Sequence, residues 1–158
     1  MREGFHHIVL PEYSLVVPVT TEGHFVMVRE FKTGVGAVCL NASAGMLRPG
    51  EDPLEGARRE LLEETGYAAD DWRALGTFLA DGSTGCSRGH FFLARGAVRV
   101  AEPTLDETED IEVVLIDEPA LRAALHAGAI TMMPTACAVG LALLTLEALA
   151  RPPAGGTR

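Results

Sequence analysis

Apolar residues gather in short runs along the chain, and polar or glycine-containing turns separate the runs. Runs of this length, rich in valine, phenylalanine and isoleucine, are typical of β-strands, and Thr21–His24 has the composition of a hairpin turn. Two later segments, Glu118–Ala127 and Pro134–Ala150, favour helices. The predicted strands are Ser14–Thr20, Phe25–Phe31, Val35–Leu40, Trp72–Leu79, His90–Val100 and Ile111–Ile116.

This mixture of strands with a few helices predicts a single layered domain of the α/β or α+β class over residues 1–150. With 158 residues and 47% hydrophobic content, the chain is long enough to bury a sizeable core. The tail at residues 151–158 reads RPPAGGTR and is expected to be disordered.

A further helix is predicted between Asp52 and Gly66, because both of its ends carry strong signals. Asp52 is a good N-cap, Pro53 suits the first helical position, and Glu55 stands where a capping box has its acid. Gly66 provides the left-handed residue that ends a helix. One narrow apolar stripe should face the core, and it comprises Leu54, Ala57, Leu61 and Thr65.

Three glutamates occupy another side of this helix. Glu60, Glu63 and Glu64 share an arc of roughly 100°, and Glu51 is expected to fold back from the preceding loop to join them. Gly56 lies one turn before Glu60, where a missing side chain would leave room for a bulky anion or a hydrated ion. Carboxylate oxygens of this kind suit Mg²⁺ or Mn²⁺.

A solvated acidic face paired with Arg58 and Arg59 is the alternative interpretation of these glutamates. The wider pattern favours a metal site, because Gly45, Glu51 and Gly66 hold fixed spacings from the arginine and the glutamates. A chance match to the whole pattern has a probability on the order of 10⁻⁹ per window.

The segment at residues 45–67, GMLRPGEDPLEGARRELLEETGY, resembles the Nudix box, and the flanks extend the likeness from about Leu15 to Ala150. The resemblance implies an α/β/α sandwich: a mixed sheet with the box helix on one side and a C-terminal helix on the other. It also implies hydrolysis of a nucleoside diphosphate linked to another moiety, with Mg²⁺ or Mn²⁺ as the cofactor.

The resemblance also implies roles for individual residues. It makes Glu60, Glu63 and Glu64 the metal ligands and the Ala44 carbonyl a further ligand. Supporting roles fall to Glu51, beside the metal, and to Arg59, which would orient the glutamates.

Within the family, the chain is most similar to ADP-ribose or ADP-sugar pyrophosphatases, on the residues VMVREF at 26–31 and DETEDIEV at 106–113. This likeness makes Glu107 and Glu109 candidate bases, with Glu109 preferred, and a solvated acidic loop is the alternative. Three segments depart from the subgroup pattern. They are Asn41-Ala42-Ser43 in place of Glu-Leu-Pro, Gly82 in place of proline, and Ser87 in place of a glutamate that contacts substrate.

Two arginines are candidate contacts of a substrate diphosphate. Arg29 lies in a predicted strand, where pairing with a surface acid is the alternative. Arg88 follows a flexible glycine- and serine-rich segment, where a simple turn is the alternative.

Charge and cysteine content narrow the class of protein. A net charge of −9 argues against a duplex nucleic-acid binder, and the polar residues Met1–His7 argue against a signal peptide. Three widely spaced cysteines are expected to be free thiols in a reducing cytoplasm. As a helix, Thr135–Ala150 would reach about 24 Å, which is short of the roughly 30 Å hydrocarbon layer of a membrane. A core or homodimer helix is therefore expected, and a membrane anchor is the alternative.

The preferred function is therefore metal-dependent cleavage of a small nucleoside diphosphate derivative such as ADP-ribose or an ADP-sugar. The first alternative is a nucleoside triphosphate pyrophosphohydrolase that uses the same glutamates. The second is a Nudix-like regulator that binds nucleotides without turnover, although such a domain would be expected to have lost one of the glutamates.

Overall fold

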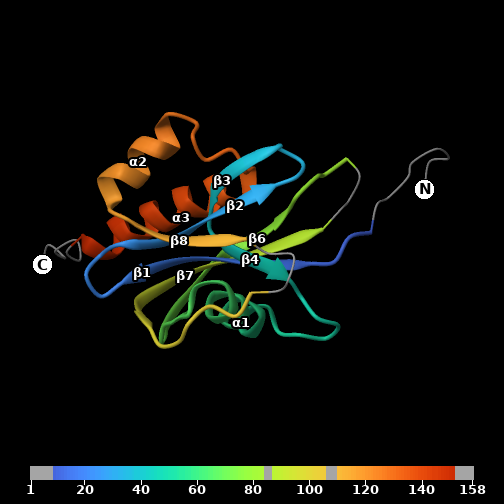
Figure 1. The fold of residues 1–158 in the computed structure, drawn as a ribbon, viewed down its shortest axis with the longest axis horizontal. Helices are drawn as coiled ribbons and strands as arrows, with labels where there is room; N and C mark the ends of the chain where they lie inside the picture. Colours follow the sequence, from blue (N-terminus) through green and yellow to red (C-terminus); the bar gives the residue numbers. More distant parts are fainter. Residues whose placement is uncertain (1–8, 84–86, 106–109, 152–158) are drawn as a thin grey trace, which may run out of the picture.

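The computed structural model describes residues 9–83, 87–105 and 110–151. It is a three-layered molecule in which a mixed sheet separates helix α1 (Pro53–Thr65) from helices α2 (Glu118–His126) and α3 (Met133–Ala150), as Figure 1 shows. The α/β/α arrangement expected from the sequence is therefore confirmed. The strands are β1 (Tyr13–Thr20), β2 (Phe25–Lys32), β3 (Ala37–Asn41), β4 (Ser43–Met46), β5 (Tyr67–Ala68), β6 (Asp71–Leu79), β7 (Arg88–Arg99) and β8 (Ile111–Ile116).

All six predicted strands and the three predicted helices are present, with ends that shift by one or two residues. The turn at Thr21–His24 joins β1 to β2, as predicted. Two strands were not predicted, β4 and β5. The residues of β4 are small and lack apolar alternation, and β5 is only two residues long, so neither carries a strand signal.

The sheet splits into two parts next to the hairpin. Strand β1 runs parallel to β7 and its ladder with β2 is confined to the pair Val19 and Phe25, while β2 pairs along its length with β8. The chain from β3 into β4 fills the split, because β3 bonds to β2 and β4 bonds to β1. Residues 41–46 therefore lie where the two parts of the sheet diverge.

Alternate residues of β1 point into two separate cores. Leu15 and Val17 belong to the larger core, which α3 covers with Ala138, Val139, Ala142 and Leu143. Val16 belongs to the smaller core, where it packs with Ala57 and Leu61 of α1 and with Phe92 and Ala94 of β7. This alternation places α1 on the face of β1 and β4 to which the Val16 side chain points. The glutamates of α1 therefore lie next to β4.

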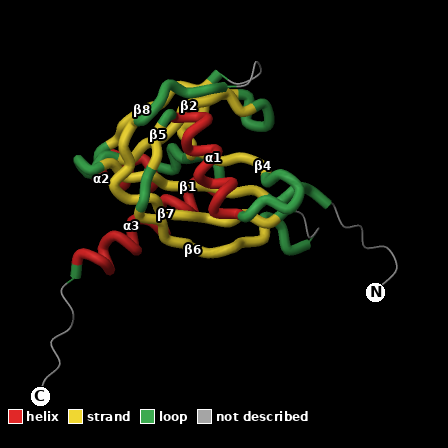
Figure 2. Tube along the Cα trace, turned by 90° about the horizontal axis from the view of Figure 1, so that it is seen from below, coloured by secondary structure: helices red, strands yellow, loops and turns green. Residues whose placement is uncertain are grey.

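Helix α3 is longer than the sequence analysis predicted. It has 18 residues, which corresponds to about 27 Å, and within the described chain it alone is long and apolar enough to span a membrane. Its first half packs on the sheet, and its last turns extend past the body of the molecule (Figure 2). Core helices of globular proteins meet the same length and composition criterion.

Candidate functional site

Helix α1 begins and ends as its sequence predicts. The Asp52 side chain accepts hydrogen bonds from the amides of Leu54 and Glu55, at 2.9 and 3.3 Å, and Gly66 ends the helix with φ of 73°. The Glu55 side chain pairs with Arg58 at 2.8 Å. The predicted stripe faces the core: Leu54 packs against it, and Ala57, Leu61 and Thr65 are fully buried.

Strand β4 lies very close to α1. A Cβ atom built on Gly45 would overlap the carboxyl group of Glu60. Glycine at this position therefore lets the strand backbone approach the glutamates of the helix. This steric requirement explains why the segment at residues 45–67 begins with a glycine.

Arg59 gathers the carboxylates around one guanidinium group. Its Nε lies 2.8 Å from Glu51, and its Nη1 lies 2.5 Å from Glu60 and 2.9 Å from Glu63. Glu51 has thus folded back from the loop, and Arg59 contacts the acids that it was expected to orient. Arg48 adds a second cation 3.5 Å from Glu63, which the sequence analysis missed although Arg48 lies inside the acidic segment.

Gly56 does not leave open space for an ion, as the sequence analysis expected. A Cβ atom built there would overlap the side chain of Leu47, and Glu51 lies just beyond it. The absent side chain makes room for the loop that returns Glu51 to the helix. The correction follows from a loop conformation that helical spacing does not reveal.

Glu64 differs from the other glutamates because it is buried. Only 6% of the residue is exposed, and its Oε2 accepts a hydrogen bond from the Ala44 amide at 3.2 Å. Burial, together with the negative charges of Glu60 and Glu30, raises the pKa of the Glu64 carboxyl to about 8. By contrast, hydrogen bonds from Arg59 and from the Arg48 amide lower the pKa of Glu51 to about 2.

The side chains of this cluster are oriented toward arginine. Among residues 9–83, 87–105 and 110–151, no group of three His, Cys, Asp or Glu side chains is arranged to hold a metal ion. Two of the predicted ligands, Glu60 and Glu63, direct an oxygen to Arg59 instead. A cation that binds here must therefore draw these carboxylates away from the guanidinium.

Without divalent cation, the protein should become less stable as the pH rises from about 4.5 to about 8. In this window the folded chain keeps a proton on Glu64 that the unfolded chain has released, so rising pH favours unfolding, by roughly 2–4 kcal/mol over the window. Urea unfolding in a chelator at several pH values measures the slope. The Glu64→Gln variant, which has no titrating group there, should show a flatter slope, and equal slopes would contradict the assignment.

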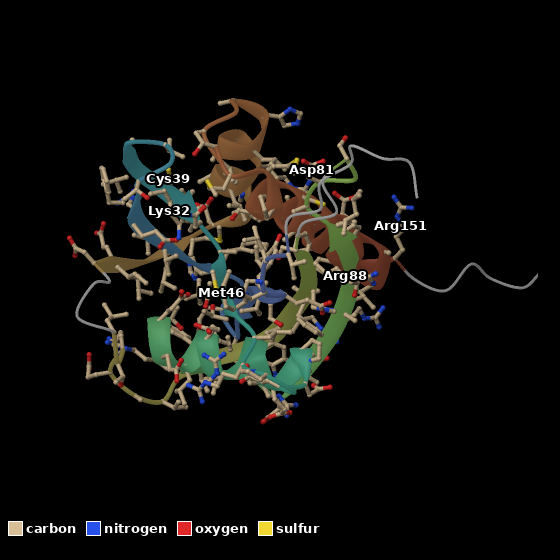
Figure 3. The ribbon with its side chains drawn as sticks, turned by 90° about the vertical axis from the view of Figure 1, so that its right-hand side faces the viewer. Lys32, Cys39, Met46, Asp81, Arg88 and Arg151 are labelled. Carbon is tan, nitrogen blue, oxygen red and sulfur yellow. The ribbon has the colours of Figure 1, made fainter. Side chains whose placement is uncertain are left out.

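Two adjoining cavities open at the split of the sheet. The acidic cavity, of about 530 Å³, is lined by the glutamates and arginines of α1 and its loop together with Ala44, Gly45, Met46 and Thr104. The apolar cavity, of about 430 Å³, shares Ala44, Gly45 and Met46 and continues along Tyr13, Leu15, Met132 and Pro134. In Figure 3, Met46 lies between Lys32, which lines the apolar cavity, and helix α1.

A chain of polar side chains lies along one wall of the apolar cavity. The Thr135 hydroxyl donates to the side-chain Oδ1 of Asn41 at 3.2 Å, and the side-chain Nδ2 of Asn41 donates to Glu30 at 2.9 Å. Lys32 lies 2.7 Å from the other oxygen of Glu30. These contacts join β2, β3 and α3, and sequence spacing gives no sign of them. They place fixed donors and acceptors beside an otherwise apolar space.

The remaining candidates lie elsewhere. Arg29 is about half exposed and lies 3.4 Å from Glu112 of β8, which matches the surface pairing considered as its alternative. Arg88 is exposed at the start of β7. Neither arginine lines the acidic or the apolar cavity in the described part of the chain. The candidate bases Glu107 and Glu109 lie outside the described residues.

Comparison with known proteins gives a consistent result. The model of the NUDIX domain matches residues 11–136. The chain is 36% identical over 105 residues to ADP-ribose pyrophosphatase of Bacillus subtilis. The aligned region covers 66% of this chain and 57% of that protein. It is 31% identical over 114 residues to the methanol dehydrogenase activator of Bacillus methanolicus, and this alignment covers 72% of this chain and 60% of that protein. The chain thus spans less than two thirds of the length of these relatives.

The fold is shared with solved structures. A crystal structure of an ADP compounds hydrolase superposes with a TM-score of 0.78 and 25% sequence identity, covering 89% of this chain and 75% of that one. The superposition agrees with the layered fold.

Proposed function

Because the chain belongs to the Nudix family, we propose that it hydrolyses the diphosphate bond of a nucleoside diphosphate linked to another moiety. The observation that carries the proposal is the pair of adjoining cavities. One is lined by carboxylates and arginines, and the other is mainly apolar with a few fixed polar groups. A substrate with a charged diphosphate and a flat, largely apolar base has the same two chemical parts.

The acidic cavity fits a divalent cation by the chemistry of its donors. Glu60, Glu63 and Glu64 line it with Ala44, whose carbonyl is the proposed backbone ligand, and Glu51 supports the cluster through Arg59. Hard carboxylate and carbonyl oxygens are the ligands that Mg²⁺ and Mn²⁺ prefer, and we propose Mg²⁺ as the natural cofactor. When bound, such a cation offsets phosphate charge and activates a water molecule.

The protein side chains divide the remaining work. Glu64 must release its proton to become a ligand, and the Ala44 amide then stabilises the carboxylate. Arg48 lies at the acidic cavity with two thirds of its side chain exposed, where it is placed to contact a phosphate oxygen. Glu109 is the proposed base, as the sequence indicated, and it lies outside the described residues.

The substrate is proposed from the relatives. One of them is named for ADP-ribose, and the superposed structure is named for ADP compounds. We therefore expect ADP-ribose or an ADP-sugar to be cleaved. The cytoplasmic location and the homodimer expected from the sequence also remain proposals, and exposed Leu144 and Leu149 on α3 support self-association.

A product assay tests the function. The protein is incubated with ADP-ribose, an ADP-sugar and nucleoside triphosphates, each with Mg²⁺, Mn²⁺ or a chelator. Release of AMP and a sugar phosphate that stops in chelator is the expected result. Pyrophosphate released from triphosphates alone would favour the alternative pyrophosphohydrolase. No metal-dependent product from any compound would favour a regulator that binds without turnover.

A further inference from the structure

Strand β4 meets helix α1 in a regular register. Ser43 and Gly45 are two residues apart on the strand, and Glu60 and Glu64 are four residues apart on the helix. Both spacings correspond to about 6 Å, so the two elements match step for step. The contact of Gly45 with Glu60 fixes one step of this register, and Ser43 then falls opposite Glu64.

The pairing of β4 with β1 places the Ser43 side chain on the same face. Ser43 lies opposite Val16, and directly opposed residues of an antiparallel pair share a face of the sheet. Val16 packs against Ala57 and Leu61 of α1. The Ser43 hydroxyl therefore points toward the helix that carries the glutamates.

The Ser43 hydroxyl is an unusual polar group in this core. The residue is fully buried, and among the residues that the structure describes its oxygen makes no hydrogen bond of normal length and angle. A buried hydroxyl without a hydrogen bond costs about 1–3 kcal/mol. An apolar side chain of the same volume would therefore be more stable at this position. The register of β4 on α1 nevertheless places this hydroxyl beside the Glu64 carboxyl, whose Oε2 accepts the amide of the next residue, Ala44.

We propose that Ser43 is a positioning residue for Glu64: its hydroxyl donates a hydrogen bond to the ionised carboxylate when Glu64 takes up a divalent cation. The Ala44 amide already donates to Oε2 of the same group. Two donors from consecutive residues of β4 would fix the plane of the carboxylate and leave its remaining lone pairs for the metal. This inference rests on the metal site of the proposed function.

Binding of Mn²⁺, followed by electron paramagnetic resonance of the free ion, tests the inference without turnover. The informative pair is Ser43→Thr and Ser43→Val, because the two side chains have the same shape and only threonine keeps the hydroxyl. Ser43→Val should bind Mn²⁺ about 10-fold more weakly than the parent protein, and Ser43→Thr should recover most of that loss. Ser43→Ala, which adds no atoms, should match Ser43→Val.

Ser14→Ala provides the matched control. Ser14 is also fully buried on the face toward α1, but its hydroxyl donates to the Pro53 carbonyl at 2.6 Å. This variant should melt at a lower temperature and keep the Mn²⁺ affinity of the parent. Equal affinity in all Ser43 variants, or an equal loss in Ser14→Ala, would overturn the role of Ser43 alone. A parent protein that binds no Mn²⁺ would overturn the metal site, and this inference with it.

Discussion

Glu64→Gln should lower kcat/KM for metal-dependent hydrolysis by about three orders of magnitude, which corresponds to roughly 4 kcal/mol of transition-state stabilisation. Glutamine has the same shape and still accepts the Ala44 amide hydrogen bond, so the fold should persist. What it lacks is the negative charge that a buried carboxylate offers to a cation. The measurement is the initial rate of AMP release with saturating Mg²⁺.

Glu55→Gln is the matched control for this change, because Glu55 lies on the same helix but is exposed and pairs with Arg58 at 2.8 Å. Its rate should stay within about twofold of the parent protein, since exposed ion pairs contribute less than about 1 kcal/mol. A Glu64→Gln variant that turns over as fast as Glu55→Gln would rule out Glu64 as a functional carboxylate.

Arg59→Gln should destabilise the metal-free protein by about 2–3 kcal/mol, which lowers the melting temperature by roughly 5–10 °C. Its side chain is 17% exposed and contacts Glu51, Glu60 and Glu63, so its loss removes a shared counter-charge from three crowded carboxylates. Saturating Mg²⁺ should recover much of the difference, because a cation then offsets the same charges. Differential scanning calorimetry with chelator and with Mg²⁺ measures both effects.

Arg58→Gln is the comparison for that experiment. Arg58 is exposed, pairs with Glu55 and lies 5.7 Å from the centre of the Trp72 ring, so its loss should cost less than about 1 kcal/mol. The cost should also be independent of Mg²⁺. If Arg59→Gln behaves like Arg58→Gln under both conditions, Arg59 does not hold the acidic cluster together.

The features that the sequence predicted correctly are those that depend on interactions between residues close together in the chain. Helix α1 was predicted to within a residue because Asp52, Pro53 and Gly66 act on their own neighbours. The box residues also identified the family, and Glu60, Glu63 and Glu64 do line one cavity. Capping and spacing require no knowledge of the rest of the fold.

The features that the sequence analysis did not predict depend on contacts between segments that are far apart in the chain. Strand β4 exists because β1 offers it a partner, and nothing in its small residues shows this. The space beside Gly56 is filled by Leu47 through a loop, and the polar chain from Thr135 to Glu30 joins three elements. The burial of Glu64 likewise arises from packing, so its altered pKa was invisible in a helix of similar glutamates.

The split in the sheet has a consequence for how such a protein diversifies. The acid-bearing wall comes from α1 and its loop, whereas much of the apolar wall comes from β2, β3 and the start of α3. Among the described residues, Ala44, Gly45 and Met46 are common to both walls. We therefore expect substitutions at Lys32, Asn41 or Met132 to change which ligand binds while the glutamates of the acidic cavity stay in place. Ligand selectivity could then be engineered separately from the proposed catalytic residues.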